Sequence, residues 1–292
     1  MYPRDFKGRA KRLDDIDLPK LGALIGVGED EIHAVLDVES RGSGFDRHGR
    51  PLILFEPHIF WRLLGDTPER RRAVAAGLAY AAWRPGNYPA DSYPRLISAI
   101  GIDETAALKA ASWGLGQVLG ENFEAAGFNS VQAMVAAMCD DEEHHLAAMV
   151  RFIKANSLDR AIRAHDWRAF AKGYNGPGYA THDYHNRLAR SFARWQGIKD
   201  TPWRPDEAIA ETKWFDPAPG VVGLPLPKSP EKPAGGPAPS PAPSPPQSPP
   251  SPPAPAAEPA RPTPVLPEPT RPAPGWLSTI ASAFRVWLES RR

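Results

Sequence analysis

This 292-residue chain has little cysteine, little net charge and no long apolar run, and each absence excludes a class of protein. A single cysteine, Cys139, rules out an intramolecular disulfide and any thiolate-rich metal site. The net charge is only +1, which excludes the strongly basic composition of a nucleic-acid-binding protein. No run of about eighteen apolar residues occurs, so no segment is expected to span a bilayer. The N-terminus also lacks the apolar run and cleavage site of a signal peptide, so we expect a protein made in the cytoplasm without one.

Proline is scarce in the first 216 residues and abundant after them: most of the 35 prolines fall between Pro217 and Pro274. Such a stretch can form neither a helix nor a strand ladder, and it favours solvated polyproline II. The sequence therefore predicts a folded domain over residues 1–200, a domain-end extension over 201–216, a disordered linker over 217–275 and a separate segment over 276–292.

The last segment has the pattern of an amphipathic helix. Its apolar stripe consists of Trp276, Leu277, Ile280, Phe284, Trp287 and Leu288. Arg285, Arg291 and Arg292 outweigh Glu289, so the segment suits an anionic surface. An apolar stripe without a core marks a membrane or partner contact. We expect contact with an anionic membrane; the alternative is that this helix docks on the domain or pairs with a second copy.

Helical signals dominate residues 18–197, with apolar residues three and four positions apart. The one convincing strand is RPLILFE, residues 50–56, and the GFDRHGR turn before it predicts a small hairpin around residues 45–55. The expected fold class is therefore α+β and mostly helical, with a small β-hairpin inserted after the first core helix.

The strongest candidate for a catalytic group is Glu39. It shares one helix face with Ile32, Val35 and Leu36, and that face packs inward. Burial and the negative end of the helix dipole both favour a protonated carboxyl, as the general acid of glycoside hydrolysis requires. On this feature alone, an alternative is a structural Glu39 paired with Arg41 or Arg50.

Two further stretches favour the catalytic interpretation of Glu39 over the structural one: SWGLGQ at residues 112–117 and YNGPGY at residues 174–179. With Glu39-Ser40 before them, they resemble the lysozyme-like superfamily of goose-type lysozymes and lytic transglycosylases. The longer stretches VESRGSGF, LFEPHIFWRL, SWGLGQVLGEN and FAKGYNGPGY resemble more closely the N-acetylmuramidase family of phage and prophage endolysins. The resemblance covers roughly residues 5–198 and rests on several separated motifs.

The resemblance implies a lysozyme-like domain that cleaves the β-1,4 bond between N-acetylmuramic acid and N-acetylglucosamine in peptidoglycan, with Glu39 as the acid. The expected partner is the glycan strand, and no cofactor is implied. The enzyme would reach the cell wall, in the periplasm, after membrane disruption. Substrate-binding candidates are Ser40, Trp113, Gly116, Gln117, Tyr174, Asn175 and Tyr179.

For several of these residues the sequence leaves alternatives open. Glycine at 114 and 116 lets the backbone approach a sugar, and Gln117 can donate and accept hydrogen bonds. Trp113 either stacks on a sugar or lies in the core, and Asn175 either lines the cleft or shapes a turn.

The second carboxylate is less well defined. Glu56, at the end of the predicted strand, could face Glu39 and activate a water; it could equally be an acidic residue at a helix N-terminus. Asp46 in the hairpin turn is the other candidate. Without a base, the chemistry would be that of a lytic transglycosylase, but LFEPH resembles the muramidases and favours hydrolysis. A non-catalytic wall-binding protein and a pore-forming or membrane-anchored protein are further alternatives. The histidines His144, His145, His182 and His185 lack a third ligand in register, so no metal site is expected.

Overall fold

Helices form most of the domain, as the spacing of apolar residues predicts. The computed structural model describes residues 1–40, 42–84, 86–176, 179–180 and 183–203, so the predicted linker and C-terminal helix lie outside the described residues. The N-terminal half contains α1 (Asp17–Gly22), the 3-10 helix η1 (Ala23–Ile25), α2 (Glu29–Glu39), α3 (Pro57–Leu64), α4 (Pro68–Ala75), α5 (Tyr93–Ile100) and α6 (Glu104–Lys109). The second half contains η2 (Gly120–Asn122), α7 (Val131–Asp140), α8 (Glu142–Ala155), α9 (Asp159–Arg163), α10 (Trp167–Asn175) and α11 (Tyr184–Trp195).

The helix starts follow from capping residues. The side chains of Asp103 and Ser130 accept hydrogen bonds from backbone N–H groups in the first turns of α6 and α7, as N-cap residues do. Asp141 caps α8 in the same way, directly after α7 ends. Thr67 caps α4, which begins at Pro68 and ends at Ala75.

Three short strands make one antiparallel sheet in the order β1-β2-β3. They are β1 (Ile53–Phe55), β2 (Ala111–Trp113) and β3 (Val118–Leu119), with Trp113 opposite both Ile53 and Val118. The expected strand at 50–56 is confirmed in its central part, and the turn before it closes through a bridge between Phe45 and Pro51. The other two strands were not predicted, because two or three residues are too few to show an alternating pattern.

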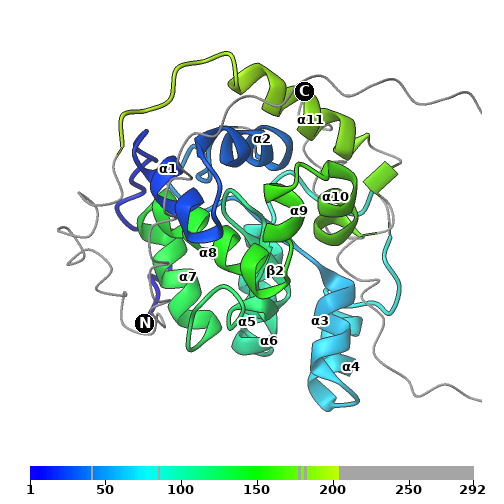
Figure 1. Cartoon of the computed structure of the whole chain (residues 1–292). Coiled ribbons are helices and arrows are strands. Elements are labelled where there is room, and N and C mark those ends of the chain that lie inside the picture. The colour runs from blue at the N-terminus through cyan, green and yellow to red at the C-terminus, as the bar shows by residue number, and fades with distance from the viewer. Residues whose placement is uncertain (41, 85, 177–178, 181–182, 204–292) are drawn as a thin grey trace, which may run out of the picture. The chain divides into compact units, whose positions relative to one another are not determined.

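The core is built around α8, whose buried residues include His145, Leu146, Met149 and Phe152. The sheet packs beside it, and β2 lies in the interior of the domain in Figure 1. The last helix, α11, packs along α2, and the two lie together at the top of Figure 1. This pairing holds the helix that carries Glu39 between the core and the C-terminal part of the domain.

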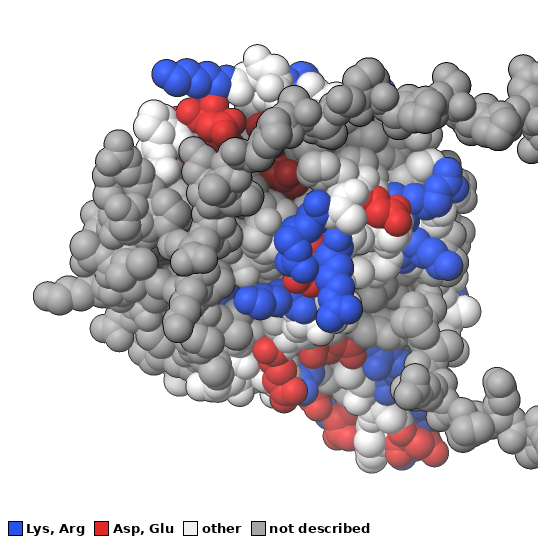
Figure 2. Space-filling model, in the orientation of Figure 1, with Lys and Arg blue, Asp and Glu red and all other residues white. Residues whose placement is uncertain are grey.

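The charged surface agrees with the near-zero net charge. On the face shown in Figure 2, acidic side chains lie beside basic ones. Within the described ranges, no helix is long and apolar enough to cross a bilayer.

Candidate active site

Glu39 lies where α2 leaves the core. Ile32 and Val35 on the same face are fully buried, whereas Glu39 itself, on the last turn, is half-buried. The helix stops at Ser40, whose backbone is extended and whose Oγ donates to the Leu36 carbonyl at 2.8 Å. The carboxyl group therefore stands at the boundary between core and surface, as the apolar spacing predicts.

The end of α10 brings an amide to this carboxyl. Asn175 is 1% exposed, and its Nδ2 donates to Oε1 of Glu39 at 3.1 Å. Within the described part of the chain, its Oδ1 is buried without a hydrogen-bond partner. A buried acceptor of this kind usually meets a water or a ligand. The two motifs that contain Glu39 and Asn175 thus meet in space.

The SWGLGQ motif forms the β2–β3 hairpin turn. Gln117 has a left-handed backbone (φ 45°), and its Nε2 donates to the carbonyls of Gly114 at 2.6 Å and Leu52 at 3.3 Å. Tyr174, one residue before Asn175, is buried and donates its hydroxyl to the Gly116 carbonyl at 2.8 Å. These contacts fix the turn internally and tie it to α10.

Two expectations for this motif need correction. Trp113 is completely buried and its indole N–H donates to the Leu108 carbonyl, so it is a core residue and presents no ring face to a sugar. A Cβ at Gly116 would come within 2.8 Å of Met149, so this glycine permits close packing against α8 and not close approach of a substrate.

Tyr179 remains at the edge of the described region. It is half-buried, and its ring meets the ring of His185 edge-on, with centroids 5.5 Å apart. His182 lies outside the described residues. Among the residues that are described, no three potential metal-ligating side chains come together.

Glu56 directly follows β1 and is the N-cap residue of α3, but it does not reach solvent. Its carboxyl is fully buried; Oε2 accepts a hydrogen bond from the Tyr88 hydroxyl at 2.6 Å, and Nδ1 of His58 lies 3.3 Å from the same oxygen. Burial raises the pKa of the Glu56 carboxyl. Activation of a water by Glu56 needs access that this conformation does not provide.

Sequence reasoning missed Tyr88, which covers Glu56. It belongs to the segment between α4 and α5, where Tyr80, Trp83 and Tyr88 follow one another closely. An aromatic cluster in a loop that contains proline and glycine was the available signal, because exposed loops seldom carry so many aromatic residues.

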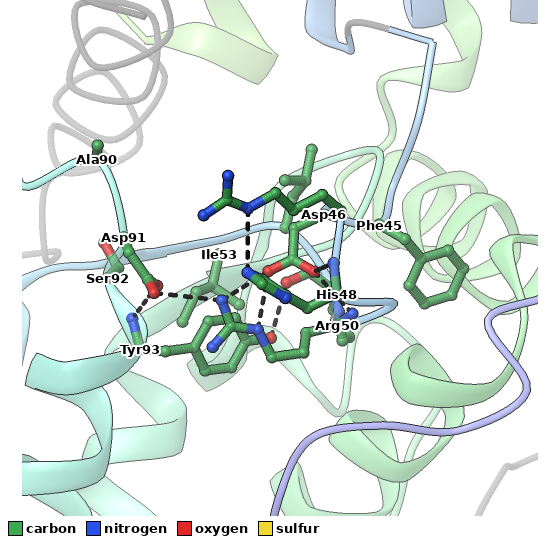
Figure 3. Close-up of a pocket in the computed structure, with 12 residues that line it drawn as sticks. Phe45, Asp46, His48, Arg50, Ile53, Ala90, Asp91, Ser92 and Tyr93 are labelled. Atoms are coloured by element: carbon green, nitrogen blue, oxygen red, sulfur yellow. Dashed lines mark hydrogen bonds and ion pairs between the residues drawn. The ribbon is translucent and has the colours of Figure 1, made fainter.

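Asp46, the other candidate for the second carboxylate, accepts hydrogen bonds from within its own turn. Its Oδ1 accepts the backbone N–H groups of His48 and Arg50, and its Oδ2 accepts Nε of Arg50 at 2.8 Å. Arg50 also pairs with Asp91 and lies over the Tyr93 ring. Figure 3 shows these side chains around a pocket of about 450 Å³ between the 45–51 turn and the start of α5.

The chain is similar to known proteins in sequence and in structure. The sequence profile of the N-acetylmuramidase family (Muramidase) matches residues 29–196. The structure is similar to the crystal structure of the Burkholderia AP3 phage endolysin, with a TM-score of 0.60 and 37% sequence identity over 64% of this chain and 73% of that one. No curated protein matches the chain. The matched range contains Glu39, the β2–β3 turn and Asn175, and from it we conclude that the chain belongs to the N-acetylmuramidase family of peptidoglycan-degrading, lysozyme-type glycoside hydrolases.

Proposed function

We propose that this protein is an endolysin that cleaves the β-1,4 bond between N-acetylmuramic acid and N-acetylglucosamine, with Glu39 as general acid. The observation that carries the proposal is the meeting of Glu39 with Asn175 at the end of two helices, within the range that matches the muramidase family. A general acid protonates the leaving oxygen while the sugar develops oxocarbenium character, so it must be both protonated and accessible. A half-buried carboxyl at a helix C-terminus suits that requirement.

Substrate binding is assigned to polar residues of the three motifs that contain Glu39, Gln117 and Asn175. Oδ1 of Asn175 and Oε1 of Gln117 are buried acceptors without a partner in the described structure, which favours a role toward N–H or O–H groups of a sugar or toward a bridging water. Ser40 lies next to Glu39, and Tyr179 follows the Asn175 motif. Tyr174 acts through the turn that its hydroxyl holds.

Glu56 is proposed as the second carboxyl group, because it directly follows the strand after the Glu39 loop and is the glutamate of LFEPH, the stretch that resembles the muramidases. In the described conformation the Tyr88 hydroxyl covers it, so this role requires that Tyr88 give way. The same burial favours a second candidate function: with only Glu39 accessible, the reaction would be that of a lytic transglycosylase, in which the sugar's own C6 hydroxyl attacks.

The proposed attachment to an anionic membrane through residues 276–292 is independent of this chemistry. That segment lies outside the described residues, and the proposal rests on its apolar stripe and its arginines.

The test is Glu39→Gln assayed on purified peptidoglycan, with mass spectrometry of the products. The amide keeps the shape of the side chain but cannot deliver a proton, so we expect a loss on the order of 10²–10⁴ in rate or more with the fold retained. Asp30→Asn, on the first turn of the same helix, is the matched control and should leave turnover unchanged.

The products separate the candidates. N-Acetylmuramic acid at the new reducing ends supports the proposed bond, whereas 1,6-anhydro ends would establish the transglycosylase. Binding to peptidoglycan without any release of fragments by the wild type would identify a non-catalytic wall-binding protein. A tenth or more of wild-type activity in Glu39→Gln would remove Glu39 from its assigned role.

A further inference from the structure

The first turn of α8 has the sequence EEHH, and none of its residues has a role in the function proposed above. It contains two fully or almost fully buried polar side chains, Glu142 (2% exposed) and His145 (0% exposed). Buried ionisable groups are costly unless their hydrogen bonds are satisfied. Their partners show what these two side chains do.

Glu142 holds the loop that follows Glu39 and Ser40. Its Oε1 accepts the backbone N–H of Gly44 at 2.6 Å and lies 3.3 Å from the Ser43 hydroxyl, which donates to it. Its Oε2 accepts Nε of Arg12 at 2.9 Å and the backbone N–H of Leu13 at 3.1 Å. Arg12 in turn donates to the carbonyl of Gly42 and to the Ser43 hydroxyl. One buried carboxylate therefore fixes the chain three to five residues beyond Glu39.

His145 holds the same loop and the β2–β3 turn together. The backbone N–H of Leu115 points at its Nδ1 at 3.3 Å, and its Nε2 lies 2.6 Å from the Met138 carbonyl. Because an amide N–H donates and a carbonyl accepts, Nδ1 is the acceptor and Nε2 carries the hydrogen. Burial lowers the pKa of His145 to about 4, which keeps the ring in this neutral form at neutral pH.

Two glycines show how closely both segments rest on this ring. A Cβ at Gly114 would lie 2.6 Å from the imidazole, and a Cβ at Gly44 would overlap it. Phe45 also packs against the imidazole, with ring centroids 4.9 Å apart. Any side chain at these positions would push the loop or the turn away from α8.

These contacts form a closed series that begins and ends at Glu39. Glu39 leads into the loop held by Glu142 and His145; His145 leads to the β2–β3 turn; Tyr174 links that turn to α10; and Asn175 returns to Glu39. We propose that Glu142 and His145 are positioning residues for the reaction, which set the Glu39 carboxyl and the β2–β3 turn relative to one another. This inference rests on the proposed role of Glu39.

The test uses full-length protein carrying His145→Gln, His145→Asn or Ser43→Ala. Glutamine reaches the Met138 carbonyl but offers no acceptor at the Nδ1 position, whereas asparagine keeps an acceptor there. Ser43→Ala removes the hydroxyl that donates to Glu142 and accepts from the Phe45 backbone N–H. It tests the same loop if a His145 variant fails to fold. His144→Gln is the matched control, because His144 is half-buried and the described hydrogen bond of its ring is to the Ala137 carbonyl, outside both the loop and the β2–β3 turn.

Kinetics on soluble peptidoglycan fragments are measured at a temperature at which unfolding curves show each variant to be folded. A displacement of about 1 Å can cost as much as 10²-fold in rate. We expect kcat per folded molecule to fall about tenfold or more in His145→Gln, with KM within about twofold of wild type, and His145→Asn to recover part of kcat. A residue that only stabilised the fold would lower the melting temperature and leave kcat unchanged.

Wild-type kcat in the folded His145 and Ser43 variants, or a rise in KM that accounts for the whole loss, would overturn the inference. An inactive wild-type protein would instead overturn the proposed function. The two failures are therefore distinguishable.

Discussion

Replacement of Glu56 by glutamine should stabilise the domain at neutral pH, although it removes an ionisable group that hydrogen-bonds with Tyr88. The Glu56 carboxyl is fully buried, and burial raises its pKa above the ordinary value of 4.5. Above that value the unfolded chain has released the proton while the folded protein still holds it. Because the unfolded state then binds fewer protons, the free energy of unfolding of the wild type falls as pH rises, until the folded carboxyl ionises as well.

The magnitude follows from this linkage. Each pH unit within that window costs the wild type about 1.4 kcal/mol, which in a domain of this size lowers the melting temperature by roughly 3–6 °C. Glutamine does not titrate and keeps an oxygen for the Tyr88 hydroxyl. The other carboxyl oxygen, Oε1, has no partner in the described structure, so its replacement by NH2 exchanges one unpaired polar atom for another.

The assay is thermal unfolding of wild type and Glu56→Gln from pH 4 to pH 8. The advantage of the variant should grow with pH above about 4.5 and then level off. Glu104→Gln, which removes a solvent-accessible carboxylate paired with Arg4, is the matched control. A constant difference between wild type and Glu56→Gln across the whole range would refute the argument from burial.

Turnover of the same variant decides whether Glu56 takes part in the reaction. If Glu56 activates a water once Tyr88 has moved, Glu56→Gln should be more stable and much less active, and Asp46→Asn should retain far more turnover. Full activity in Glu56→Gln would remove Glu56 from the mechanism, and full activity in Asp46→Asn as well would leave neither candidate for the second carboxyl group.

Two further expectations concern the lone cysteine and the tail. Burial raises the pKa of the Cys139 thiol to about 12, so a thiol reagent should label the protein only after unfolding; rapid labelling of the native protein would contradict the packing of α7. A 1–216 fragment should digest purified peptidoglycan as fast as the full chain but lose binding to anionic vesicles, and equal vesicle binding by both would show that residues 276–292 are no membrane element.

The sequence was sufficient to place Glu39 because helical periodicity is a local property. Ile32, Val35 and Leu36 define the buried face of α2, and Glu39 falls on that face one turn later. The approach of Asn175 to Glu39 followed from motif resemblance, since nothing local in residues 167–175 indicates which helix end they meet.

The burial of Trp113 and Glu56 could not be read from their neighbours. Trp113 lies in a three-residue strand, and Ile53 of β1 and Phe6, which lie beside it, are both distant in sequence. Glu56 ends an apolar strand, which is compatible with either a cleft or the core. Only the segment that carries Tyr88 decides between them, and its path depends on long-range packing.

Most residues of the three motifs make contacts within the protein itself. Gly114 makes room for His145, Gly116 makes room for Met149, Tyr174 donates to the turn, and Nε2 of Gln117 donates within it. Cleavage of a glycosidic bond requires few chemical groups, but these must be held within fractions of an ångström of their positions. Most residues of a motif can therefore position those groups without touching the substrate. On this argument a change at Glu142 or His145, which no glycan strand needs to touch, should slow the reaction as surely as a change beside the substrate.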